Sequence, residues 1–119
     1  MVDIDESLSL AKNKRDLARD MLKMLIDSLP KSRSDIQAHY EAADYASLQE
    51  VVHKLHGGSC YCGVPQLRES SSTLDRLLVK KQIDNLDSLV GRIILDIDNL
   101  VDWANKNDLD ALFGTAKAG

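Results

Sequence analysis

An apolar repeat near the C-terminal end of the sequence constrains the fold more than any other feature. Its residues alternate spacings of three and four: Ile83, Leu86, Val90, Ile93, Ile97, Leu100 and Ala104. This spacing places them on one face of a long α-helix, which must pack against other elements along its length. No stretch of useful length alternates apolar and polar residues with a period of two, so no strand is expected.

Other segments carry the same helical period. Apolar residues recur from Leu8 to Leu29, and Pro30 is expected to end this helix, with a shorter helical segment after it. Asp44 is expected to cap a third helix, which Gly63 breaks or bends. Pro65 suits the first turn of a fourth helix. The predicted fold is all-α: an up-and-down four-helix bundle with an additional short helix or a helical N-terminal extension.

The length of 119 residues predicts a single domain. Its ordered core is expected at about residues 8–104, with a partly flexible tail at 105–119 in which Leu109, Leu112 and Phe113 could dock a short helix. The net charge is −4, and the basic residues are scattered among acidic ones, so direct nucleic-acid binding is not expected.

No run of 18 or more apolar residues occurs, and the first residues lack the pattern of a signal peptide. A soluble, cytoplasmic chain without direct membrane contact is expected. Cys60 and Cys62 lie two positions apart, where a helix directs their side chains to different faces, so both are expected to be free thiols.

Residues 53–63, "HKLHGGSCYCG", hold the candidate site. On a regular helix one face collects the residues expected in the core: Leu48, Val52, Leu55, Ser59 and Cys62. His53 lies about 150° from the centre of that face and therefore points outward. It shares its stripe with Ala46, Gln49, Glu50, Gly57 and Cys60.

Gly57, one turn after His53, has no side chain to obstruct the imidazole. Glycine inside a helix costs roughly 0.5–1 kcal/mol relative to alanine, so a functional reason for it is expected. Something bulky would have to come within bonding distance of His53.

An exposed neutral imidazole is a competent nucleophile near neutral pH, because its ordinary pKa is about 6.5. Glu50 or Gln49 could accept the Nδ1 proton of His53 and leave Nε2 as the attacking atom. Lys54 and His56 are candidate cations for phosphoryl oxygens. The arrangement suits phosphoryl transfer, in which positioning and charge neutralisation supply most of the catalysis.

The motif "HKLHG" resembles the signature of histidine phosphotransfer (HPt) domains, and the segments "DLARDMLKMLIDSLP" and "CGVPQL" around it resemble the HPt modules of BarA/GacS-type tripartite hybrid sensor kinases. The similarity covers nearly the whole chain, as a single HPt domain over residues 1–119. It implies a four-helix bundle whose exposed histidine, here His53, is reversibly phosphorylated.

The resemblance also implies partners. The phosphoryl group would come from an aspartate on the receiver domain of the same hybrid kinase and pass to the receiver aspartate of a response regulator. Magnesium would belong to the receiver, so no cofactor or metal is expected in this domain, and neither is autonomous ATP-dependent kinase activity. The module would be the cytoplasmic C-terminal part of a membrane-anchored kinase, and monomeric when isolated.

One position departs from the family pattern. HPt domains commonly have lysine three residues after the phosphorylated histidine, and this chain has His56. Either Lys54 takes over the electrostatic role, or assistance at this position is weak or depends on pH.

Two alternatives remain open on the sequence. His53, His56 and Cys60 project within roughly 60° of one another on a regular helix and could form three corners of a zinc site, although Cys62 falls on the opposite face and "CYC" lacks the spacing usual for zinc. The chain could also be a non-catalytic protein-interaction bundle, which would leave Gly57 unexplained.

Overall fold

The computed structural model describes residues 2–114, and all regular structure in that part of the chain is helical. The helices are α1 (Ile4–Leu10), α2 (Arg15–Glu41), α3 (Tyr45–Ser59), α4 (Pro65–Val79), α5 (Leu86–Lys106) and α6 (Leu109–Phe113). The prediction of an all-α fold is therefore confirmed. No helix within residues 2–114 has both the length and the apolar character needed to cross a membrane.

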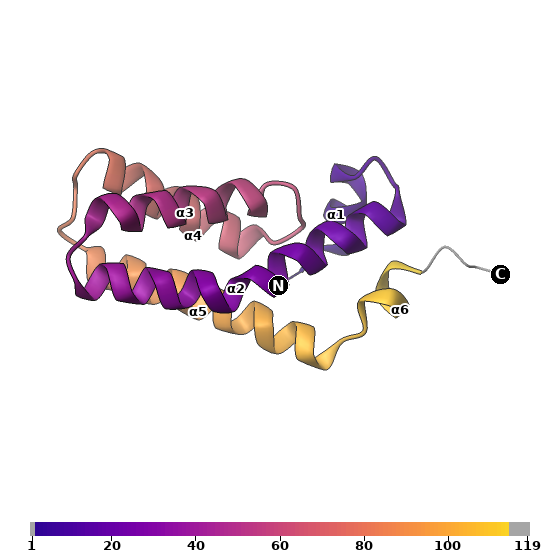
Figure 1. The fold of residues 1–119 in the computed structure, drawn as a ribbon. Helices are drawn as coiled ribbons and strands as arrows, with labels where there is room; N and C mark the ends of the chain where they lie inside the picture. The colour runs from indigo at the N-terminus through magenta and orange to yellow at the C-terminus, as the bar shows by residue number, and fades with distance from the viewer. Residues whose placement is uncertain (1, 115–119) are drawn as a thin grey trace.

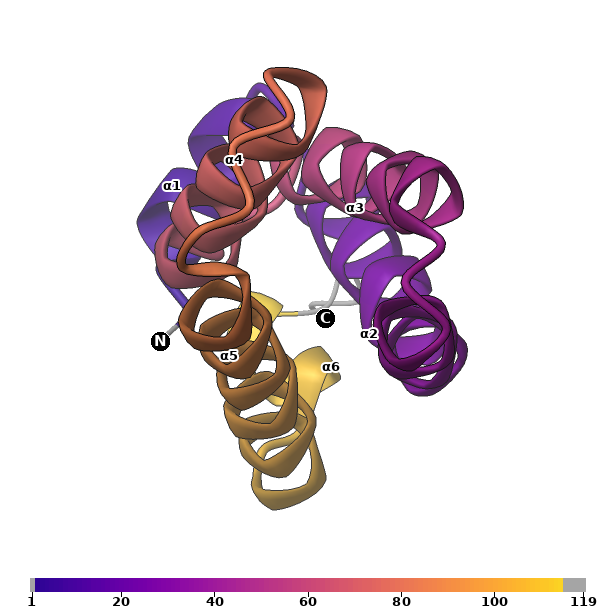
Figure 2. The same ribbon diagram turned by 90° about the vertical axis from the view of Figure 1, so that its left-hand side faces the viewer.

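Helices α2 to α5 form an antiparallel, up-and-down bundle (Figure 1). Each packs against two neighbours, so that α2, α3, α4 and α5 close a ring around one core (Figure 2). Short connections between successive helices favour this arrangement. Each helix contributes its apolar stripe to the core, which includes Leu22, Leu29, Ile36, Leu48, Val52, Leu67, Leu74, Ile93 and Ile97.

Helix α2 continues through Pro30, so the expectation that Pro30 ends it is wrong. A proline inside a helix costs about 3 kcal/mol, because it removes a hydrogen bond and crowds the preceding turn. Here the pyrrolidine ring is exposed, and buried residues lie both before it, at Leu22 and Leu29, and after it, at Ile36. Packing of both halves of α2 on the bundle offsets the local cost.

The helix expected from Leu8 is in fact divided. Helix α1 ends at Leu10, and Lys12 and Asn13 adopt left-handed conformations in the turn before α2. The expected short helix or N-terminal extension is thus α1. Helical structure reaches beyond residues 8–104 at both ends, since α6 occupies part of the expected tail; residues 115–119 lie outside the described part.

Gly63 does not break α3, which ends four residues earlier at Ser59. Its role is to let α1 approach the turn between α3 and α4. The carbonyl of Gly63 accepts from Asp3 N at 2.7 Å, and its own N–H donates to Ser7 Oγ at 2.9 Å. A Cβ atom at this position would lie 2.1 Å from the carbonyl oxygen of Asp3, so no side chain fits.

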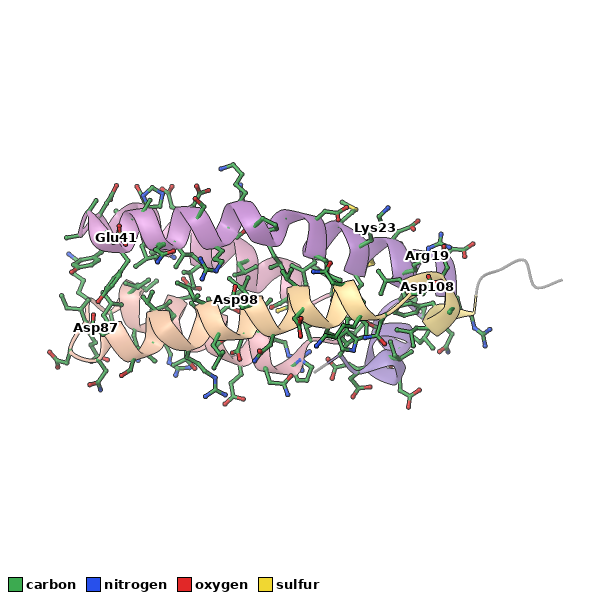
Figure 3. The ribbon with its side chains drawn as sticks, turned by 90° about the horizontal axis from the view of Figure 1, so that it is seen from below. Arg19, Lys23, Glu41, Asp87, Asp98 and Asp108 are labelled. Carbon is green, nitrogen blue, oxygen red and sulfur yellow. The ribbon has the colours of Figure 1, made fainter. Side chains whose placement is uncertain are left out.

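Helix α6 returns to α2, close to Arg19 (Figure 3). Arg19 meets Asp110 at 3.3 Å, and Phe113 is buried. The expected docking of a short helix is confirmed for Phe113 and for Leu109, which packs against the core, whereas Leu112 is exposed. Ile83, in contrast, precedes α5 and is exposed, so it is not part of the core face to which the sequence assigned it.

Two predicted helix starts are confirmed. The side chain of Asp44 accepts from Ser47 N at 3.2 Å and caps α3, and Pro65 is the first residue of α4. The C-terminal cap of α2 contains an unusual residue, because Ala43 adopts a left-handed conformation (φ 53°). Ala43 N donates to Tyr40 O at 3.1 Å and Asp44 N to His39 O at 2.9 Å, the two bonds of a Schellman cap that usually contains glycine.

We expect Ala43→Gly to raise the free energy of unfolding by about 0.5–1 kcal/mol, because glycine removes the steric cost of the left-handed conformation. The matched control is Ala38→Gly, five residues earlier on the exposed side of α2, which should lower it by about 1 kcal/mol. Urea denaturation measures both. A loss of stability in both variants would contradict this account of the cap.

Candidate functional site

His53 lies on the outer side of α3, and its side chain is 70% exposed. The opposite side of the helix is buried, as predicted, and consists of Leu48, Val52, Leu55 and Ser59, with Cys62 in the turn that follows. The outward orientation of His53 is therefore a direct result of the apolar stripe of α3.

The imidazole of His53 is oriented by Asp75 on α4. The distance from His53 Nδ1 to Asp75 Oδ2 is 2.9 Å. An ionised carboxylate can only accept hydrogen bonds, so Nδ1 carries the proton in the neutral ring. The lone pair is then on Nε2, the nitrogen that no hydrogen bond within residues 2–114 occupies.

Asp75 is itself held in place, because Gln49 Nε2 donates to Asp75 Oδ1 at 2.7 Å. The Asp75 side chain is only 15% exposed. Burial acts to raise the pKa of Asp75, but the hydrogen bonds from His53 and Gln49, together with the nearby charge of His53 and His56, bring that pKa below its ordinary value. Asp75 therefore remains an ionised acceptor at neutral pH.

This contact corrects one expectation from the sequence. Gln49 and Glu50 were the candidate acceptors for the Nδ1 proton of His53, but the acceptor is Asp75. Gln49 acts at one remove by binding Asp75, and Glu50 points to a groove between α2 and α3. Asp75 stands directly after Leu74 and three residues before Leu78, at the border of the apolar stripe of α4. This position could be recognised in the sequence, but the contact of Asp75 with His53 could not.

Gly57 leaves open space beside His53. A Cβ atom built at Gly57 would meet no other atom within 4 Å, apart from its own helix and chain neighbours. Its neighbour Gly58 differs, since a Cβ there would contact Leu25 of α2 at 3.5 Å. The surface of α3 next to His53 is thus open at Gly57. It is covered by another helix only at Gly58, where α3 contacts α2.

The two candidate cations lie in different surroundings. Lys54 is exposed and lines the groove between α2 and α3. His56 is half-buried and turned toward Ser71 and Cys60, with its Nδ1 3.3 Å from Ser71 Oγ and its Nε2 3.6 Å from Cys60 Sγ. Within residues 2–114, no three His, Cys, Asp or Glu side chains form a group that could hold a metal ion.

An apolar groove of about 930 Å³ runs between α2 and α3, next to the His53 face. Two large apolar side chains stand out from it, Met24 at 72% and Tyr61 at 62% exposure. Charged residues of both signs border it, including Lys31, Glu50 and Lys54. An exposed apolar surface of this kind, rimmed by polar residues, is typical of a protein-binding site.

Comparison with known proteins gives consistent results. The family model described as "Hpt domain" matches residues 20–112. The sensor histidine kinase GacS of Pseudomonas protegens is 44% identical over 99 residues, which cover 78% of this chain and 11% of GacS. The signal transduction histidine-protein kinase BarA of Escherichia coli K12 is 31% identical over 106 residues, covering 88% of this chain and 12% of BarA.

A solved structure agrees with these relatives. The crystal structure of the HPT domain from a sensor hybrid histidine kinase of Shewanella superposes with a TM-score of 0.84 at 31% identity, covering 88% of this chain and 91% of that one. The chain spans only about a tenth of the length of the curated kinases that it matches. A helical bundle with an outward histidine, the family match and these relatives lead to one conclusion: the chain belongs to the Hpt domain family.

Proposed function

We propose that His53 is the residue of this Hpt domain that is reversibly phosphorylated in a phosphorelay. It accepts the phosphoryl group from an aspartyl phosphate on the receiver domain of its hybrid kinase and passes it to the receiver aspartate of a response regulator. The observation that carries the proposal is the contact between His53 Nδ1 and Asp75, which holds an exposed imidazole with Nε2 free.

The proposed transfer is a displacement at phosphorus. Nε2 of His53 attacks, a nitrogen–phosphorus bond forms, and the bond to the receiver aspartate breaks to release a carboxylate. The imidazole gains positive charge while Nδ1 keeps its proton. Asp75 accepts a hydrogen bond from Nδ1 and stabilises that charge, as the aspartate of a catalytic triad does for its histidine. The reverse sequence delivers the phosphoryl group to the second receiver.

Both receivers are proposed to dock over the His53 face and the neighbouring groove. Met24 and Tyr61 supply exposed apolar contact area, and the flexible Met side chain can adapt to more than one partner. Gly57 allows a close approach to His53. Lys54, at the edge of the groove, is placed to attract the acidic surroundings of a receiver aspartate. The magnesium ion is expected in the receiver, and no cofactor is proposed for this domain.

His53→Gln tests the assignment. The variant should keep the fold, because the side chain is exposed, and should lose phosphate acceptance completely. The measurement follows acid-labile, alkali-stable label after mixing the domain with a phosphorylated receiver. His39→Gln serves as the control, since His39 lies in the last turn of α2, beside Asp44 and not Asp75. Label on the His53 variant equal to that on the wild type would refute the assignment.

Asp75→Asn tests the orienting carboxylate. We expect the rate of phosphate acceptance to fall about tenfold to a hundredfold, because an amide of the same shape cannot stabilise a charged imidazole. Asp98→Asn is the matched control, because Asp98 is also paired, with Arg33 at 2.7 Å, but lies on α5. Rapid-quench kinetics with a phosphorylated receiver measures both variants. Equal rates in the two would remove Asp75 from the mechanism.

Gly57→Leu separates steric access from nucleophilicity. The substitution should raise the free energy of unfolding by about 0.5–1 kcal/mol, since leucine favours an exposed helix position over glycine. Transfer from the receiver should nevertheless be lost, because leucine would occupy the open space beside His53. Direct phosphorylation by the small donor phosphoramidate should persist. Normal transfer from the receiver would show that Gly57 is not needed for its approach.

A further inference from the structure

His56 is part of a hydrogen-bonded chain that the proposed relay does not use. Its Nδ1 lies 3.3 Å from Ser71 Oγ on α4, and its Nε2 lies 3.6 Å from Sγ of Cys60, the residue that caps the C-terminal end of α3. The order Ser71, His56, Cys60 is that of an orienting group, a base and a nucleophile. His56 occupies the position at which HPt domains commonly have lysine.

The directions of these hydrogen bonds follow from Ser71. Its side chain is fully buried, and its hydroxyl lies 2.7 Å from the carbonyl oxygen of Leu67, to which it donates its single proton. Ser71 Oγ can then only accept from His56, so Nδ1 of His56 carries the ring proton. The lone pair of Nε2 faces Cys60 Sγ, and the thiol donates to it.

The second cysteine has opposite surroundings. Cys62 is 2% exposed, and burial raises the pKa of its thiol to about 11. Cys60 is partly exposed, its Sγ lies 3.6 Å from His56 Nε2, and it lies near Arg68. The pKa of Arg68 is raised mainly by its hydrogen bond with Glu6, so Arg68 is a cation in this neighbourhood. A partly exposed thiol beside a histidine and a cationic residue is the typical setting of a reactive cysteine.

We propose that Cys60 is a modification site: a nucleophilic thiol, with His56 as its base, that forms mixed disulfides with small disulfides. His56 Nε2 takes the thiol proton, the Cys60 thiolate attacks one sulfur of the disulfide, and the second sulfur leaves as a thiolate. That thiolate takes the proton back from His56. One disulfide bond forms and one breaks, so no other oxidant is required.

The adduct would obstruct the His53 face. Cys60 follows His53 by seven residues, which on a helix is almost the same direction and about 10 Å along the axis. Between them lies Gly57, where no side chain occupies the space. A tripeptide-sized adduct on Cys60 covers this gap and blocks the approach of a receiver. This consequence rests on the proposed role of His53, whereas the reactivity of Cys60 does not.

The first experiment measures thiol reactivity with the aromatic disulfide 5,5′-dithiobis(2-nitrobenzoate) on the folded protein. Wild type should show one fast thiol, absent in Cys60→Ser, while Cys62 reacts only after unfolding. The reference is the double variant Cys60→Ser, Ala46→Cys, whose new thiol is exposed on α3 without a histidine partner. We expect Cys60 to react about tenfold faster than this reference.

His56→Gln should reduce the rate at Cys60 to that of the reference, and Ser71→Ala, which keeps the histidine, should reduce it in part. Circular dichroism verifies the fold of each variant. A rate at Cys60 no higher than that of the reference, or one unchanged in both the His56 and the Ser71 variant, would overturn the proposal.

The second experiment compares phosphate acceptance by reduced protein, protein treated with oxidised glutathione, and treated protein that is then reduced with dithiothreitol. Acceptance should fall at least tenfold on treatment and return on reduction, while Cys60→Ser transfers at the reduced wild-type rate throughout. Equal acceptance by the wild-type adduct would overturn the obstruction. No acceptance by reduced wild type would instead refute the role of His53 and leave the first experiment as the measure of Cys60.

Discussion

The antiparallel packing of α3 on α4 is the contact on which the site depends. It buries the apolar stripe of α3, and Val52, next to His53, belongs to that stripe. Because neighbouring residues of a helix differ by about 100° in direction, burial of Val52 keeps His53 at the surface. The same packing brings Asp75 of α4 to 2.9 Å from His53 and Ser71 to 3.3 Å from His56. One helix pair thus orients two histidines for different partners.

The two oriented histidines differ mainly in exposure. His53 is 70% exposed and meets a carboxylate, so its free nitrogen faces solvent and any docked protein. His56 is half-buried and meets a hydroxyl, so its free nitrogen faces a neighbouring thiol. In each ring the partner of Nδ1 determines which nitrogen is free to react. At this position, where HPt domains commonly have lysine, the side chain of His56 is turned toward Ser71 and Cys60.

The glycines near the site serve different purposes. Gly57 faces open space, so its effect is to leave the helix surface beside His53 without a side chain. Gly63 lies against Asp3 and Ser7, so its value is the close approach of two segments of the same chain. That approach ties α1 to the turn between α3 and α4, with the ion pair between Arg68 and Glu6 on the same side. The turn that follows the site helix is thereby anchored.

The sequence alone determined the helical class, the N-cap Asp44, the helix start at Pro65, the buried face of α3 and the outward direction of His53, because each follows from the local pattern within one segment. It did not determine that α2 continues through Pro30. The free-energy cost of a proline inside a helix can be recognised from the sequence, but the packing that offsets this cost cannot. Nor did it determine that Asp75 holds His53, or that Ser71 holds His56. Asp75 and Ser71 lie on α4, and residues 22 and 15 positions apart meet only when two helices adopt one packing register. Local pattern sets the direction of a side chain relative to its own helix, and tertiary packing selects its partner.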